Sequence, residues 1–134
     1  MPNKNSAIEW LEKAYHNLSA GELLYNANHY ADTIAVEIHY SIEKTLKAFL
    51  AYENKKIPKT HDLLDIYDLI TEHINLNEYE DMLDTISKYH IEASYPAFHR
   101  HLPSFEELKE ALNLATDIFT KTCKILDINK EDIK

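Results

Sequence analysis

The stretch that decides the fold is residues 30–53, YADTIAVEIHYSIEKTLKAFLAYE. Its apolar side chains recur every three or four residues, the spacing that places them on one face of an α-helix. They are Ile34, Ile38, Ile42, Leu46, Phe49 and Leu50. The spacing predicts a helix from about Tyr30 to Glu53. The polar residues Glu37, Glu43, Lys44 and Lys47 are interpreted as its solvated face, with weak local ion pairs.

Helical patterns continue on both sides of this stretch. Each begins at a residue type that caps helix N-termini, and two begin with the Ser-x-x-Glu capping box. The predicted helices are about Ser6 to Asn26 (box Ser6–Glu9), about His61 to His73 (cap Thr60), Asn77 to about His90 (Asn77 with Glu80), and Ser104 to about Leu126 (box Ser104–Glu107).

Turn-forming residues are scarce, with one glycine and four prolines. An all-β chain needs a turn every 8–12 residues or so, and this sequence does not supply them. We therefore predict an all-α fold, a mostly antiparallel up-and-down bundle of four long helices plus one short helix. We expect a single domain over residues 1–134, with its core at about 6–126.

Composition and charge exclude several classes of function. The net charge is −9, with 14 basic and 23 acidic residues, which opposes non-specific DNA binding. Nowhere do roughly 18 apolar residues run together, so we expect no membrane span. No apolar run follows the first lysine, so we expect no signal peptide and a cytoplasmic protein. Cys123, the one cysteine, is expected to be a buried hydrophobic residue.

Three short motifs now suggest a family. They are Ser41-Ile-Glu-Lys-Thr-Leu-Lys-Ala-Phe-Leu50, then Thr60-His-Asp-Leu63, then Ala93-Ser-Tyr-Pro96. Their order and spacing resemble the HEPN family of small bacterial and archaeal helical proteins, in which the last motif reads Ala-Arg-Tyr-Pro. The resemblance covers roughly Ile8 to Leu126.

The resemblance implies a helical bundle that is usually a homodimer. It also implies that the chain is the partner of a minimal nucleotidyltransferase in a two-component system, frequently toxin–antitoxin, with a contribution to nucleotide binding. Active HEPN toxins are metal-independent ribonucleases that use an arginine and, about four to six residues later, a histidine for phosphate stabilisation and proton transfer. Here Ser94 replaces the arginine of the Ala-Arg-Tyr-Pro motif, and Arg100, the only arginine, is followed directly by His101 and by no later histidine. The ribonuclease motif is absent as written, so we expect a non-catalytic or differently acting member.

The segment around the sole arginine holds the candidate site residues. His99, Arg100 and His101 are the catalytic candidates if the chain is instead a ribonuclease with a rearranged site. Tyr95, Phe98 and Arg100 are the candidates for binding a nucleotide, because aromatic rings stack on bases and arginine binds phosphate. The alternative is a solvated loop in which Arg100 pairs with a surface carboxylate.

The other histidines suggest no further site. Eight histidines are present, but His99, His101 and His90 do not form a metal-ligand pattern, so we expect neither a metal nor a cofactor. His61 and Asp62 could form an acid–base pair. We favour a structural interpretation in which Thr60 caps a helix and Asp62 lies in its first turn.

Overall fold

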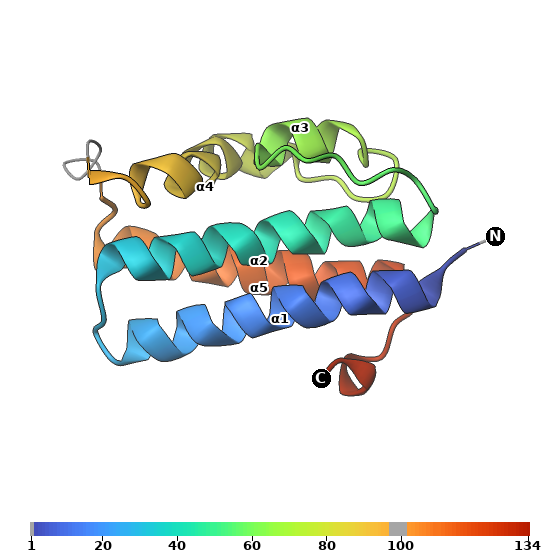
Figure 1. Cartoon of the computed structure of the whole chain (residues 1–134), viewed down its shortest axis with the longest axis horizontal. Helices are drawn as coiled ribbons and strands as arrows, with labels where there is room; N and C mark the ends of the chain where they lie inside the picture. Colours follow the sequence, from blue (N-terminus) through green and yellow to red (C-terminus); the bar gives the residue numbers. More distant parts are fainter. Residues whose placement is uncertain (1, 97–101) are drawn as a thin grey trace.

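The computed structural model describes residues 2–96 and 102–134. Within them the chain forms α1 (Lys4–Asn26), α2 (Ala31–Tyr52), α3 (Leu63–Asp68), η1 (Asn77–Tyr79), α4 (Glu80–Glu92), α5 (Phe105–Ile125) and η3 (Lys130–Asp132). The helices α1, α2, α4 and α5 run alternately in opposite directions (Figure 1). For the described residues, the predicted all-α bundle of four long helices and one short helix is confirmed.

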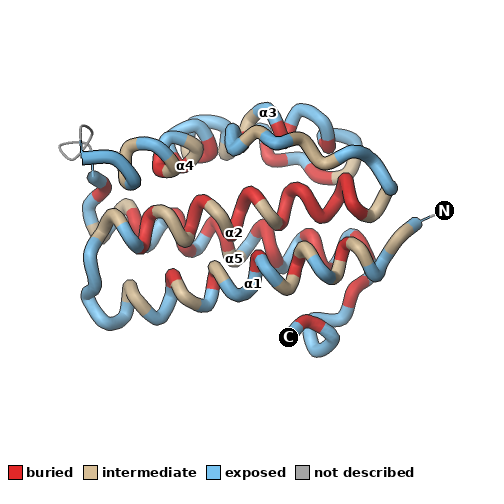
Figure 2. The backbone as a smooth tube through the Cα atoms, viewed as in Figure 1, coloured by how far each residue is buried: buried red, intermediate tan, exposed pale blue. Residues whose placement is uncertain are grey.

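The central element is α2. It packs against α1 and α5 on one side, and against α3 and α4 on the other (Figure 1). Ile34, Ile38, Ile42 and Leu46 are fully buried. From Ser41 onward the helix is buried on nearly every face, as the red run in Figure 2 shows. A helix that is apolar on most of its surface needs neighbours on all sides, and here both layers provide them.

Two helix starts were predicted from capping boxes, and one of them was wrong. The helix α1 begins at Lys4, because the Oδ1 atom of Asn3 accepts a hydrogen bond from the backbone N–H of Ser6, at 3.0 Å. Asparagine is as good an N-cap as serine, and the backbone N–H of Asn3 also donates to the carbonyl of Tyr52. The predicted cap at Ser104 is confirmed, because its Oγ atom accepts from the N–H of Glu107 at 3.1 Å, whereas the Glu107 carboxylate accepts from the hydroxyl of Tyr89.

The short helix α3 differs from its prediction in both cap and length. Asp62, not Thr60, is the N-cap, and its carboxylate accepts hydrogen bonds from two N–H groups of the first turn. The Thr60 hydroxyl instead accepts from the N–H of Asp62, at 3.1 Å. The helix ends at Asp68, and the chain continues in turns to His73. The predicted helix from about His61 to His73 was therefore wrong in extent, although a short helix is present.

Asn77 does not cap α4 as predicted. Its side chain accepts a hydrogen bond from the hydroxyl of Tyr67, at 2.9 Å. The same hydroxyl accepts from the backbone N–H of Leu76, at 2.6 Å. The helix α4 begins at Glu80 after the 3-10 turn, without a side-chain cap. A buried tyrosine recruits the asparagine because its hydroxyl needs a partner.

Three long helices end in the same way without glycine. Asn28, Asn54 and Asp127 follow α1, α2 and α5 with φ angles of 55°, 58° and 55°. After each of them, an N–H returns to a carbonyl in the last turn, the Schellman arrangement. These bonds join His29 to Leu24, Lys55 to Leu50 and Ile128 to Cys123, at 3.0, 2.9 and 2.9 Å. Asparagine and aspartate tolerate this left-handed conformation better than other residues with side chains.

Two expectations based on composition can be compared with the fold. Cys123 is 2% exposed, so the expected burial is confirmed, and that burial raises the pKa of its thiol. In the parts of the chain that the structure describes, none of the helices has the length and apolar character needed to cross a membrane.

Candidate functional site

A buried ion pair lies in the middle of α2. The Nζ atom of Lys47 is 2.9 Å from Oε2 of Glu43, one helical turn earlier, and the two side chains are only 6% and 5% exposed. The prediction that this pair lies on a solvated face was therefore wrong. The segment that leads into α3 and the helix α4 pack on α2 beside Glu43, and Lys47 lies over the ring of Trp10 in α1, contacts that the spacing of α2 alone could not indicate. Burying two charges is costly, so such a pair needs further hydrogen bonds.

His61 supplies one of those hydrogen bonds from the segment before α3. Its Nδ1 atom lies 2.9 Å from Oε1 of Glu43. A carboxylate can only accept, so Nδ1 carries the proton and donates it, which leaves Nε2 for a ligand. Burial alone would raise the pKa of Glu43, but the hydrogen bonds from Lys47 and His61 outweigh it, and the pKa lies below its ordinary value.

Two further histidines pack against this pair. The ring of His90, from α4, stacks on that of His61 with centroids 4.1 Å apart and planes at 15°. His39 is fully buried, and its Nε2 atom donates to the carbonyl of His61 at 2.9 Å. Within the described residues, the Nδ1 atom of His39 has no hydrogen-bond partner and lies 3.7 Å from Oε1 of Glu43.

The environment keeps these two histidines neutral. Burial lowers the pKa of His39 from 6.5 to about 4, although the charge of Glu43 opposes the shift. Burial and the neighbouring His61 also lower the pKa of His90. At neutral pH both rings are therefore uncharged imidazoles, and His39 fills space behind the Glu43–His61 hydrogen bond.

A cleft of about 530 Å³ opens beside this cluster, and we call it the histidine groove. Its wall includes His61 and His90, with Tyr95 (57% exposed) at the C-terminal end of α4. Its charged wall residues are Asp62, Asp84 and Lys88. Lys88 pairs with Asp84 at 3.3 Å, so the wall has more negative than positive charge.

This arrangement supports defined chemistry. An imidazole held by a carboxylate through Nδ1 is fixed in orientation and can accept a hydrogen bond or a proton at Nε2. The aromatic and imidazole rings offer flat surfaces to a planar ligand. The carboxylates oppose an anion deep in the groove. The groove therefore suits a planar heterocycle that carries a hydrogen-bond donor.

The sequence-predicted site residues fall into two groups. Tyr95 lies in the histidine groove. Phe98, His99, Arg100 and His101 lie outside the described residues. The groove instead depends on Glu43, His61 and His90. For His61 the sequence suggested an acid–base pair with Asp62 as well as a structural role. No sequence pattern indicated that Glu43 and His90 lie beside His61.

Comparisons with known proteins give one family match and one similar solved structure. The model of the HEPN domain matches residues 7–126. The chain is also similar to the crystal structure of TT1696 from Thermus thermophilus, with a TM-score of 0.78 and 26% sequence identity. That likeness covers 90% of this chain and 98% of the other. A comparison with curated proteins gave no match.

Proposed function

This chain belongs to the HEPN domain family, and from that premise we propose that it is a homodimeric partner of a minimal nucleotidyltransferase whose histidine groove receives a nucleotide. The observation that carries the proposal is the Glu43–His61 hydrogen bond, which presents an oriented imidazole to a cleft with Tyr95 at its edge. A cleft of about 530 Å³ is of the size that small-molecule ligands occupy.

The groove favours one orientation of a nucleotide. The base stacks on Tyr95 or His90, because every base has a π face that an aromatic ring can cover. The Nε2 atom of His61 accepts from an amino or hydroxyl group of the base or ribose. The phosphates lie toward Lys88 and solvent, away from Asp62, because like charges repel.

The end of the bundle near the groove supports the partnership. Figure 1 places the end of α1, the start of α2 and the end of α4 at the same end of the bundle, and several exposed apolar side chains belong to these segments and to the residue stretch just before α5. They are Leu23, Tyr30, Ile91, Tyr95 and Leu102, with exposures of 70%, 74%, 51%, 57% and 37%. Clustered exposed apolar side chains mark protein interaction surfaces more often than isolated ones do.

The partnership is tested by copurification. The tagged chain is coexpressed with any minimal nucleotidyltransferase that a neighbouring gene encodes, and the mass of the complex is measured by light scattering. We expect two copies of this 15.7 kDa chain, with the enzyme bound. Ile91→Asp should dissociate the second copy of the chain, the enzyme, or both. Leu69→Asp, at an equally exposed apolar position (51% each), should dissociate neither. A monomer that never copurifies with the enzyme would overturn this part of the proposal.

Nucleotide binding is tested separately by calorimetric titration of the full chain with AMP and with ATP. His61→Ala and Tyr95→Ala should each weaken binding by about tenfold, because each removes one interaction worth roughly 1.4 kcal/mol. His16→Ala is the matched control, since His16 is exposed on α1, and none of the described residues that line the groove belongs to α1. Absence of saturable binding by the wild-type protein would contradict the nucleotide assignment.

A second candidate function is metal-independent RNA cleavage, and the same hydrogen bond favours it. A histidine oriented by a buried carboxylate can take the proton of a 2′-hydroxyl at Nε2, and the imidazolium so formed can return that proton to the leaving oxygen. If this candidate is right, RNA is cut in the presence of EDTA, and His61→Ala abolishes cleavage. If the site is instead the predicted His99–Arg100–His101 segment, the triple alanine variant loses activity and His61→Ala retains it. A wild-type protein that cuts no RNA excludes both.

A further inference from the structure

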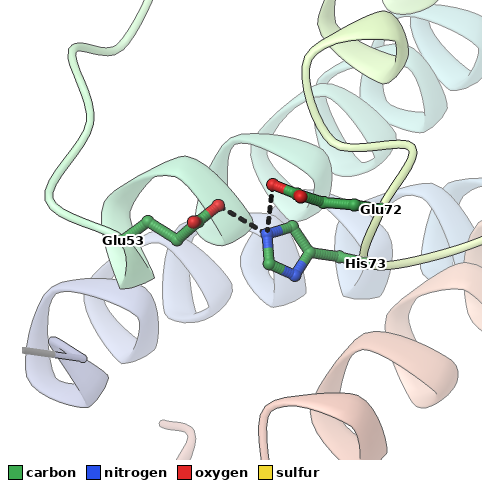
Figure 3. Close-up of side chains that lie close together, drawn as sticks. All are labelled: Glu53, Glu72 and His73. Atoms are coloured by element: carbon green, nitrogen blue, oxygen red, sulfur yellow. Dashed lines mark hydrogen bonds and ion pairs between the residues drawn. The ribbon is translucent and has the colours of Figure 1, made fainter.

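A second cluster of histidine and glutamate lies at the opposite end of α2 from the α1–α2 connection. Glu53 is the residue that ends α2, and Glu72 and His73 belong to the turns after α3 (Figure 3). The Nε2 atom of His73 is 2.5 Å from Oε1 of Glu53 and 3.8 Å from Oε1 of Glu72. One nitrogen and two carboxylate oxygens of these residues lie within 4.8 Å of one another. These are ligand types that zinc and related ions prefer.

Two nitrogen-bearing side chains already converge on the same pair of oxygen atoms. Besides His73, the Nζ atom of Lys55 lies 3.4 Å from Oε1 of Glu53 and 3.8 Å from Oε1 of Glu72. The hydrogen bond from His73 is the main reason that the pKa of Glu53 lies below its ordinary value. The two carboxylates therefore create a position between two segments of the chain that favours positive charge.

The imidazole in this cluster is held in place by packing. The ring of His73 stacks on that of Phe49, with centroids 5.5 Å apart and planes at 15°. Phe49 is fully buried, so it is a rigid support, and His73 itself is only 22% exposed. Lys55, by contrast, is 48% exposed and can turn into solvent. One ligand is thus preorganised, and the competing cation is free to leave.

We propose that Glu53, Glu72 and His73 form a binding site for a divalent transition metal of the zinc class, with water in the fourth position. On binding, His73 coordinates through Nε2 as the neutral ring, the ion takes the place of its proton, and the ammonium of Lys55 moves away. Zinc–ligand distances near 2.0–2.2 Å separate tetrahedral ligands by about 3.3 Å. The distance between Nε2 of His73 and Oε1 of Glu53 therefore lengthens when the ion binds. The ion would join the turn after α3 to the end of α2. The proposal departs from the sequence-based expectation of no metal and is independent of the proposed function.

The test uses zinc chloride alone with the full-length protein, measured by calorimetry and by thermal unfolding. Wild type should bind one ion per chain and unfold at a higher temperature with zinc. Glu72→Gln and His73→Gln should each weaken binding at least tenfold, whereas His61→Gln and His90→Gln should leave it unchanged. Glu72 is 68% exposed, so its variant reports on binding even if His73→Gln does not fold.

Lys55→Met sharpens the test, because the two interpretations predict opposite results. In a metal site, removal of the competing ammonium should tighten zinc binding several-fold. In a mere ion-pair network, the same change weakens the cluster and produces no zinc binding. Cobalt provides a spectroscopic signature, since four-coordinate Co²⁺ absorbs strongly in the visible and six-coordinate Co²⁺ does not. The proposal is overturned if wild type binds no zinc, or if binding survives in Glu72→Gln and His73→Gln.

Discussion

The same three side-chain types meet at two places along α2. Glu43 is paired with His61 and Lys47 near its middle, and Glu53 with His73 and Lys55 at its end. At 1.5 Å per residue, the two glutamates are about 15 Å apart along the helix axis. The carboxylate of Glu43 is 5% exposed and that of Glu53 is 25% exposed.

That difference in burial changes what the same residues can do. In the interior a charge cannot be left without a partner, so the Glu43 cluster is fixed and orients His61 toward the groove. At the surface, water screens each charge, so the Glu53 cluster is worth little to stability and can exchange one cation for another. The comparison teaches that the surroundings, rather than the residue types, separate a structural ion pair from an exchangeable one.

The largest effect should come from neutralising the buried glutamate. Glu43→Gln leaves the ammonium of Lys47 buried without a countercharge, which typically costs about 3–5 kcal/mol. Urea unfolding followed by circular dichroism measures the loss. Glu43→Leu combined with Lys47→Leu removes both charges and should recover most of the stability. A loss below about 1 kcal/mol in Glu43→Gln would show that the two clusters are energetically alike.

The pH dependence of stability should be the next largest effect. The unfolded chain takes up a proton on His39 near pH 6.5, whereas the folded chain resists protonation until the pKa of about 4. The contribution of His39 to the free energy of unfolding is therefore fully present above pH 6.5 and is lost as the pH drops toward 4. At roughly 1.4 kcal/mol per pH unit of difference, the loss is about 3 kcal/mol. The groups facing His39 are Glu43, His61 and His90.

His39→Gln isolates this contribution. Glutamine keeps a donor for the carbonyl of His61 and does not titrate. The unfolding free energy of the variant should depend much less on pH between 6.5 and 4. The pH dependence that remains comes from His90, whose pKa is also lowered. Denaturant unfolding at half-unit pH intervals measures both curves. Parallel curves for wild type and variant would contradict the assignment to His39.

The smallest effect should come from the surface glutamate. Glu53→Gln should cost about 1 kcal/mol or less, because exposed ion pairs contribute little. Salt distinguishes the two clusters further. In 1 M NaCl the stability loss of Glu53→Gln should shrink and that of Glu43→Gln should stay nearly unchanged, since only the exposed pair is screened. Urea unfolding at low and high salt gives both differences.

The sequence predicted the helices better than their ends, and the ends better than the site. The spacing of Ile34, Ile38 and Ile42 was sufficient for α2, because a periodic apolar pattern is a local property. The start of α1 was placed at Ser6 because its capping box was complete, but Asn3 caps the chain three residues earlier by accepting from the N–H of Ser6, which extends the helix to Lys4. The cap of α3 moved from Thr60 to Asp62 because the Asp62 carboxylate accepts from the N–H groups of Leu64 and Asp65.

The site depended on contacts that no local pattern contains. Glu43 and Lys47 form an ordinary surface pair by spacing, and they are buried because the chain around His61 returns across α2. Tyr95 was predicted to bind a nucleotide together with Phe98 and Arg100, whereas the residues that line the groove with it come from the segment before α3 and from α4. The three-dimensional approach of segments distant in sequence was the missing information.

The left-handed turns after α1, α2 and α5 also act on the unfolded chain. Asn28, Asn54 and Asp127 have side chains, so they sample fewer backbone conformations when unfolded than glycine would. Each turn therefore loses less entropy on folding, which offsets part of the roughly 1–2 kcal/mol that a left-handed residue costs. With a single glycine in 134 residues, the chain begins folding from a narrower ensemble, and this source of stability appears in no contact of the folded protein.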